Sequence, residues 1–171
     1  MSAKKINIRE LSLKEIKSSL KNLGEQDFRG KQIYEWLWQK DAFSFEDMTN
    51  LSISLREKLA QEFFIDHITL KDQQISIDKT IKCAFSVGEN KVIEGVLIPT
   101  DKRTTACISS QIGCSLACKF CATGKLKLMR NLNAGEIVDQ VVYLKEQASS
   151  RYNKSLSNIV YMGMGEPLLN Y

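Results

Sequence analysis

Hydrophobic residues in the first 65 positions recur every three or four residues, the spacing of one face of an α-helix. The helices predicted from this spacing cover residues 13–23, residues 28–40, and a third stretch that begins near Ser52 or Ser54. Ser12 and Glu15 have the spacing of a capping box, and so do Ser54 and Glu57. The pattern therefore predicts a small helical module at the start of the chain.

After residue 65 the spacing changes to an alternation of apolar and polar residues, which predicts β-strands. The predicted strands cover residues 75–77, 81–87, 92–98 and 104–109. The segment Gly88–Asn90 has the composition of a turn between two of them. We therefore expect a small antiparallel sheet that follows the helical module.

The last third of the chain predicts a strand, a loop, a helix and a second strand. The helix carries apolar residues at helical spacing from Ile137 to Ala148, and residues 158–162 have the pattern of a buried strand. Two strands joined by a crossover helix form a βαβ unit with a parallel pair. The predicted fold class is thus α/β, with a helical and antiparallel β module before the parallel part.

Composition limits the possible classes. The 171 residues are 43% hydrophobic and 26% charged, which excludes disordered and collagen-like chains. Apolar runs are far shorter than the ~18 residues of a membrane span, and the N-terminus lacks the apolar core of a secretory signal. We therefore expect a cytoplasmic protein without membrane contact. Five cysteines, three of them within eight residues, favour a metal or redox centre over a disulfide framework.

The net charge of +4 is unevenly distributed. Between Lys102 and Gly135 there are six basic residues and no acidic one. Such a zone can attract an anionic partner, nucleic acid included. Charge alone favours the simpler interpretation, in which these are solvated residues of a loop.

Three cysteines, Cys114, Cys118 and Cys121, are separated by four and then three positions. Structural zinc needs four ligands, and Cys83 or Cys107 could be the fourth. A thioredoxin-like pair would use Cys118 and Cys121 and leave Cys114 without a role. A 4Fe–4S cluster explains all three thiols, and with three ligands one iron keeps an open position.

This spacing resembles that of the radical S-adenosylmethionine (SAM) superfamily. The resemblance implies that the open iron binds SAM and that electron transfer cleaves SAM to a 5′-deoxyadenosyl radical. The segment Gly163–Pro167, at the end of the next predicted strand, resembles the superfamily's Gly-Gly-Glu-Pro segment. By this resemblance Gly165 and Glu166 would contact SAM.

A closer resemblance is to the bacterial RlmN/Cfr-type RNA adenine methyltransferases. The matching segments are Cys107–Cys114, Cys118–Gly124, Arg130–Leu132 with Glu136 and Ile137, Met162–Asn170, and upstream Phe28–Ile33 with Trp36. Members methylate carbon 2 of adenine in large-subunit ribosomal RNA and often in transfer RNA, and related resistance enzymes methylate carbon 8. The resemblance implies a 4Fe–4S cluster, SAM, an electron donor such as flavodoxin or ferredoxin, and a monomer.

The same resemblance assigns roles to single residues. Cys114, Cys118 and Cys121 would ligate the cluster, Glu94 would accept a proton, and Cys107 would help to resolve a covalent intermediate with RNA. Removal of the proton from the attacked carbon does require a base. Glu94 lies in an otherwise apolar strand, where we expect desolvation to raise its pKa. From the residues alone, a structural glutamate is the simpler interpretation.

We expect an accessory, RNA-binding domain over residues 1–95 and the start of a radical SAM partial barrel over residues 96–171. From Thr104 onward the chain has room for two strands and one helix, whereas even a partial barrel needs more. The family's methyl-carrying cysteine lies near the C-terminus, and no cysteine follows Cys121. The sequence therefore predicts a truncated barrel that is inactive alone. The alternatives are a carbon-8 methyltransferase, another radical SAM enzyme, or a zinc-containing RNA-binding module.

Overall fold

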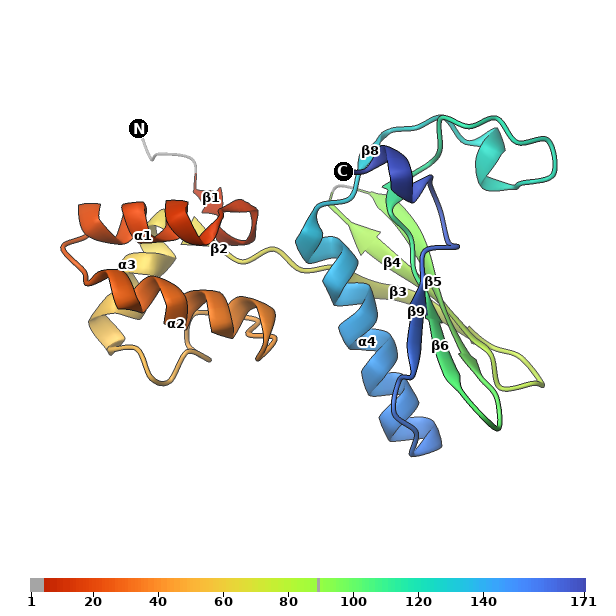
Figure 1. Cartoon of the computed structure of the whole chain (residues 1–171), viewed down its shortest axis with the longest axis horizontal. Helices are drawn as coiled ribbons and strands as arrows, with labels where there is room; N and C mark the ends of the chain where they lie inside the picture. The colour runs from red at the N-terminus through yellow and green to blue at the C-terminus, as the bar shows by residue number, and fades with distance from the viewer. Residues whose placement is uncertain (1–4, 89) are drawn as a thin grey trace. The chain divides into compact units, whose positions relative to one another are not determined.

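The computed structural model describes residues 5–88 and 90–171 (Figure 1). The chain forms two compact units, one up to Asp66 and the other from His67 to Tyr171. Each unit has its own cluster of buried apolar side chains. None of the helices in the described ranges combines the length and apolarity needed to cross a lipid bilayer.

The first unit is mainly helical. Its elements are β1 (Ile6–Asn7), the 3₁₀ helix η1 (Ile8–Glu10), α1 (Leu13–Asn22), α2 (Asp27–Trp38), α3 (Ile53–Glu62) and β2 (Phe63–Phe64). β1 and β2 pair in parallel. The three helices predicted from the apolar spacing are confirmed, with ends that differ by one or two residues.

The starts of α1 and α3 are fixed by serine caps. At α1, Ser12 Oγ accepts a hydrogen bond from the Glu15 N–H, and the Ser12 N–H donates to Glu15 Oε2 at 2.7 Å, so the predicted capping box is confirmed. At α3, Ser52 Oγ accepts from the Leu55 N–H at 3.2 Å. The alternative start at Ser54 is wrong, because Ser54 lies inside the first turn of α3.

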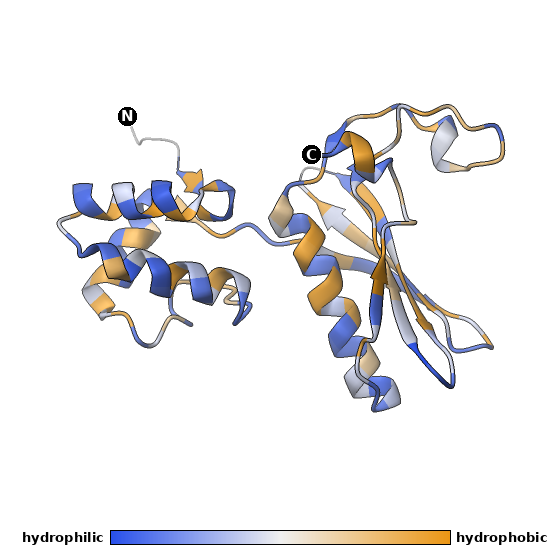
Figure 2. Cartoon of the chain, in the orientation of Figure 1, coloured by the Kyte–Doolittle hydropathy of each residue, from blue (hydrophilic) through white to orange (hydrophobic). Residues whose placement is uncertain are grey.

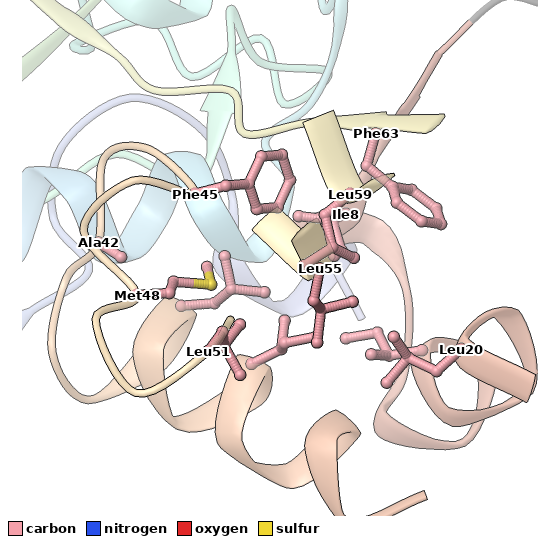
Figure 3. Packing of buried hydrophobic residues seen from close by; sticks show 12 residues of the cluster. Ile8, Leu20, Ala42, Phe45, Met48, Leu51, Leu55, Leu59 and Phe63 are labelled. Carbon is pink, nitrogen blue, oxygen red and sulfur yellow. The ribbon is translucent and has the colours of Figure 1, made fainter. Parts of the chain in front are cut away.

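The core of the first unit gathers side chains from all of its helices. Its fully buried members include Ile16 and Leu20 of α1, Ile33 and Leu37 of α2, and Leu55 and Leu59 of α3. Figure 3 shows Leu55 and Leu59 within this cluster. One apolar stripe on each helix thus builds the core, as helical spacing requires.

Replacing Leu59 with alanine is expected to destabilise the first unit by about 2–5 kcal/mol, because it leaves a cavity at a fully buried position. Since the second unit has its own core, amides of its strands should keep their hydrogen-exchange protection. Hydrogen exchange measured by NMR on the Leu59→Ala variant and on the wild type checks this. Equal loss of protection in both units would show that they unfold together.

The second unit is a five-stranded mixed sheet with one long helix. Its elements are β3 (Thr69–Ile75), β4 (Ile81–Val87), β5 (Lys91–Pro99), β6 (Thr104–Cys107), β7 (Gln111–Ile112), the 3₁₀ helix η2 (Thr123–Lys125), β8 (Arg130–Asn131), α4 (Ala134–Tyr152), β9 (Asn158–Val160) and the 3₁₀ helix η3 (Pro167–Leu169). The sheet order is β3-β4-β5-β6-β9, and β9 runs parallel to β6. The predicted βαβ unit and the α/β fold class are confirmed.

The two faces of this sheet differ. Ile93 and Leu97 of β5 are fully buried, and Gly95 between them lies so close to α4 that an added Cβ would stand 3.5 Å from Leu144 Cδ1. Glu94 and Val96 alternate with these residues and point to the opposite face. Figure 1 shows α4 along one face of the sheet, and Figure 2 shows the mixed hydropathy of α4 that this position requires. Among the described residues of the second unit no helix covers the other face, which we call the open face.

Several strands are shorter or more exposed than the sequence predicts. β6 ends at Cys107, two residues early, and Ile77 lies in an exposed turn after β3. The strand predicted over residues 158–162 is confirmed, but its predicted length and burial are wrong. β9 covers Asn158–Val160, and Ile159 is 46% exposed because β9 is an edge strand whose partner is β6. In the predicted turn at residues 88–90, Glu89 lies outside the described residues.

The division into compact units falls elsewhere than the expected domain boundary at residues 95 and 96. β3, β4 and β5 belong to one sheet with β6 and β9, so contacts group residues 67–95 with the rest of the second unit. The division expected from the sequence concerns function, with RNA binding before residue 96 and cofactor chemistry after it. That functional division remains a prediction.

Candidate functional site

The segments that follow β6 and β9 run beside each other at one edge of the sheet. The Ile108 N–H donates to the Val160 carbonyl at 2.9 Å, and the Gly163 N–H donates to the Ile108 carbonyl at 3.0 Å. The Ser110 N–H then donates to the Met164 carbonyl at 2.9 Å. The carboxyl ends of parallel strands are where α/β proteins bind ligands. The approach to the cysteine loop and the Gly163–Pro167 segment are therefore neighbours at the expected edge.

Two glycines allow this close approach. A Cβ added at Gly163 would stand 2.7 Å from the Ile108 carbonyl oxygen and from Ser109 Oγ. Gly165 has φ +97°, and a Cβ there would stand 2.5 Å from Gln111 Cβ. The main chain of the second segment thus packs directly on the first, with no room for side chains at these positions.

The cysteine loop leaves β7 and returns at β8, which pair with each other. Inside it, the Cys114 N–H donates to the Leu126 carbonyl at 3.3 Å, and the Cys121 N–H donates to the Cys118 carbonyl at 3.1 Å. A Cβ added at Gly124 would stand 2.7 Å from the Cys118 carbonyl oxygen. The loop is therefore closed by main-chain contacts and not by an apolar core of its own.

The three predicted cluster ligands share this loop. Cys118 is exposed, and Cys114 and Cys121 are half-buried. Cys114 Sγ accepts from the Leu116 N–H at 3.4 Å, and hydrogen bonds from the main chain of Gly124 and Thr123 lower the pKa of the Cys121 thiol. Over residues 5–88 and 90–171 no three His, Cys, Asp or Glu side chains are gathered as a metal-holding group. The three thiols therefore share one loop without forming such a group in the described part of the chain.

This donor set fits an iron–sulfur cluster in its chemistry. Thiolates are the usual ligands of such clusters, and main-chain N–H groups that point at sulfur stabilise the thiolate form. Phe120, between two of the cysteines, does not shield them, because its side chain is 94% exposed.

A buried ion pair anchors the end of the loop. Arg130 of β8 donates to both carboxylate oxygens of Glu136 at 2.6 and 2.7 Å, and the Glu136 side chain is 6% exposed. Glu136 also accepts from the Asn133 N–H at 2.9 Å within the capping box that starts α4. Bidentate pairs of this kind fix geometry as well as contribute energy. The match of Arg130 and Glu136 to the family therefore has a local structural reason.

Glu94 and Cys107 both lie on the open face of the sheet, away from α4. Cys107 pairs in register with Val96, which shares a face with Glu94. The Glu94 side chain is 46% exposed and forms an ion pair with Lys82 Nζ at 2.7 Å. The Glu94 carboxylate is thus half-exposed and paired, whereas its apolar neighbours in the sequence predict burial. Burial, by contrast, raises the pKa of the Cys107 thiol, and a main-chain hydrogen bond from Met162 offsets part of this effect.

The sequence did not single out three buried polar residues at this edge. Ser109, Gln111 and Gln140 are fully buried, and each hydrogen-bonds to main chain elsewhere in the unit. The sequence signal for these residues is the polar run Ser109–Gln111 directly after a strand. The same run could equally begin a solvated loop, so the sequence does not predict that it is buried. Their partners are set by tertiary structure.

The fold and the site resemble the first part of a radical SAM methyltransferase. A solved radical SAM methyltransferase from Sphaerobacter thermophilus superposes with a TM-score of 0.81 at 39% identity, and covers 97% of this chain and 49% of its own. Residues 6–65 match the family described as the ribosomal RNA large subunit methyltransferase N-terminal domain.

Curated relatives agree. A probable dual-specificity RNA methyltransferase RlmN from Cytophaga hutchinsonii is 55% identical over 98% of this chain and 46% of the relative. The corresponding protein of Flavobacterium psychrophilum is 51% identical over 100% of this chain and 49% of the relative. The RlmN of Geotalea uraniireducens is 45% identical over 97% of this chain and 47% of the relative. The chain spans about half the length of these relatives. Over nearly its whole length the chain is therefore similar to the first half of the RlmN-type radical SAM methyltransferases, which confirms the resemblance stated from the sequence.

Proposed function

We propose that this chain provides the cluster- and SAM-binding part of an enzyme that methylates carbon 2 of adenine in large-subunit ribosomal RNA and in transfer RNA. One observation carries the proposal: the chain that leads from β6 to the three-cysteine loop lies beside the Gly163–Pro167 segment that follows β9. The relatives are named dual-specificity RNA methyltransferases, which supports RNA as the substrate class.

In this proposal Cys114, Cys118 and Cys121 hold a 4Fe–4S cluster, and Gly165 with Glu166 contacts SAM. The cluster would supply the electron that splits SAM and so begins radical chemistry. The chain itself contributes thiolates held by main-chain N–H groups and a glycine main chain that SAM can approach without side-chain obstruction. The Glu166 N–H donates to Gln111 Oε1 at 2.9 Å, and Glu166 Oε1 accepts from the Leu168 N–H at 3.0 Å. The carboxylate has further acceptor sites that a ligand could use.

Glu94 is proposed to take the proton from carbon 2 of the adenine, and Cys107 to help release the RNA from its covalent intermediate. Glu94 projects from the open face with its carboxylate half-exposed, where an extruded base can reach it. Its partner Lys82 is half-exposed too, and an exposed pair of this kind is worth at most ~1 kcal/mol. The carboxylate can therefore exchange Lys82 for a substrate at little cost.

The remaining assignments also belong to this proposal. Residues 1–95 would contact RNA and residues 96–171 would begin the barrel. Flavodoxin or ferredoxin would deliver the electron to a monomer in the cytoplasm. Exposed lysines of the cysteine loop would add phosphate contacts, because the loop contains no acidic residue.

Anaerobic reconstitution of the 171-residue chain with iron and sulfide tests the core of the proposal. We expect a brown protein with broad absorption near ~400 nm and about four irons and four sulfides per chain, as for a 4Fe–4S cluster. SAM should perturb the electron paramagnetic resonance spectrum of the reduced protein. A colourless protein that instead takes up one zinc ion would favour the zinc-containing RNA-binding module.

In a chimera that joins residues 1–171 to the C-terminal half of a curated relative, Glu94→Gln is expected to abolish RNA methylation and to retain SAM cleavage. The amide cannot accept the proton from carbon 2. Mass spectrometry of the modified nucleoside measures this and also distinguishes carbon 2 from carbon 8. Asp72→Asn is the matched control, because Asp72 and Glu94 share the open face through their common neighbour Ala84. Normal methylation by the Glu94 variant would leave Glu94 a structural residue.

A further inference from the structure

The chain leaves the β5–β6 ladder before Ser109, where a side chain of α4 replaces the missing strand partner. The ladder ends with the pairing of Val96 and Cys107. The Ser109 N–H donates to Gln140 Oε1 at 2.8 Å, and Gln140 Nε2 donates to the Ser109 carbonyl at 3.1 Å. Both residues are fully buried, so the main chain of Ser109 is satisfied away from water.

The hydroxyl of Ser109 joins two segments that are far apart in the sequence. Ser109 Oγ donates to the main-chain carbonyl of Glu94 at 2.6 Å and accepts from the Met164 N–H at 2.8 Å. A hydroxyl has one proton and two lone pairs, so it makes both bonds at once. One buried atom thus ties the strand of the proposed base to the Gly163–Pro167 segment.

Gln111 holds the next part of the same segment. Its Oε1 accepts from the Glu166 N–H at 2.9 Å, and its Nε2 donates to Asn131 Oδ1 at 2.8 Å. Asn131 belongs to β8, where the cysteine loop returns. Gln111 is fully buried, and its Cβ packs against Gly165. This side chain therefore connects Glu166 to the end of the loop that carries the three thiols.

We propose that Ser109 and Gln111 are positioning residues. They fix the main chain of the Gly163–Pro167 segment for SAM, and Ser109 also sets this segment in register with β5 at Glu94. They act through the main chain of Met164 and Glu166. The part that concerns SAM rests on the proposed function, whereas the hydrogen-bond coupling is a property of the chain alone. A buried N–H that loses its hydrogen-bond acceptor is destabilised by its full desolvation free energy. Replacing either side chain should therefore destabilise the main chain next to it by a measurable amount.

Amide hydrogen exchange of the 171-residue chain tests the coupling. In Ser109→Ala the Met164 amide is expected to exchange about tenfold faster relative to the Phe85 amide of β4, which reports global opening of the second unit. Tenfold corresponds to about 1.4 kcal/mol, the scale of one lost buried hydrogen bond. The Gln111→Met substitution nearly conserves side-chain volume. In this variant the Glu166 amide, and not the Met164 amide, should exchange about tenfold faster relative to the Phe85 amide.

The two variants are controls for each other, and Ser110→Ala is a third. Ser110 is buried beside Ser109, and in the described part of the chain it contributes main-chain hydrogen bonds only. Its replacement should leave the ratio of Met164 to Phe85 exchange at the wild-type value. An unchanged ratio in Ser109→Ala, or the same rise in Ser110→Ala, would overturn the coupling.

Titration of SAM into the iron–sulfur-reconstituted chain tests the consequence for the ligand. The dissociation constant should rise about tenfold or more in Ser109→Ala and Gln111→Met and stay at the wild-type value in Ser110→Ala. Wild-type affinity in the first two variants would overturn the positioning role. If the wild-type chain bound no SAM, both the proposed function and the role of these residues in SAM binding would be contradicted. The ratios of amide exchange rates would still test the hydrogen-bond coupling by themselves.

Discussion

Replacing Cys118 with alanine is expected to abolish the iron–sulfur absorption of the reconstituted chain while leaving its fold intact. Cys118 is exposed on the cysteine loop, and its side chain contributes nothing to either core. A cluster held by three thiolates cannot tolerate the loss of one. Absorption near ~400 nm together with iron and sulfide analysis measures the cluster content. Circular dichroism of the same samples measures whether the fold is intact.

Cys83→Ala is the matched control for that experiment. Cys83 is fully buried on β4, on the face of the sheet that α4 covers, and burial raises the pKa of its thiol. Such a thiol is poorly suited to ligate metal, so the Cys83 variant should keep the full cluster content at a small cost in stability. Full cluster content in Cys118→Ala, or its loss in Cys83→Ala, would contradict the assignment of ligands.

Gly165→Ala is expected to destabilise the second unit by several kcal/mol and to abolish SAM binding. Two effects add at this position. The backbone has φ +97°, which an L side chain rarely adopts, and the added Cβ would stand 2.5 Å from Gln111 Cβ and 2.8 Å from Gln111 N. The main-chain nitrogen of Gln111 is fixed by its bond to the Met164 carbonyl and cannot give way easily. Urea unfolding and SAM titration of the variant check this.

Gly24→Ala separates the two effects. Gly24 follows α1 with φ +75°, but an added Cβ would meet no atom within 4 Å. Its substitution should therefore cost only the strain of the left-handed backbone, about 1–2 kcal/mol, and should leave SAM binding unchanged. If both alanine variants lost similar stability, steric contact with Gln111 would not explain the requirement for glycine at position 165.

Local patterns in the sequence determined most elements of this protein. The helices of the first unit follow from apolar spacing together with serine caps, because a helix and its cap are fixed by residues within one or two turns. The same holds for the three-cysteine loop and for Gly163–Pro167, whose chemistry is contained in a few neighbouring residues. The order strand, loop, helix, strand was enough to place the two motifs at one edge of a parallel pair.

Tertiary structure alone decided how that edge is held and how exposed its residues are. Glu94 has apolar neighbours in the sequence, yet its strand alternates between two faces and only the other face meets α4. β3–β5 join the second unit because β5 hydrogen-bonds to β6, a pairing that no local pattern specifies. The partners of Ser109 and Gln111 lie up to 55 residues away in the chain. Hydrogen bonds of this range depend on the completed sheet, which is why a sequence pattern cannot reveal them.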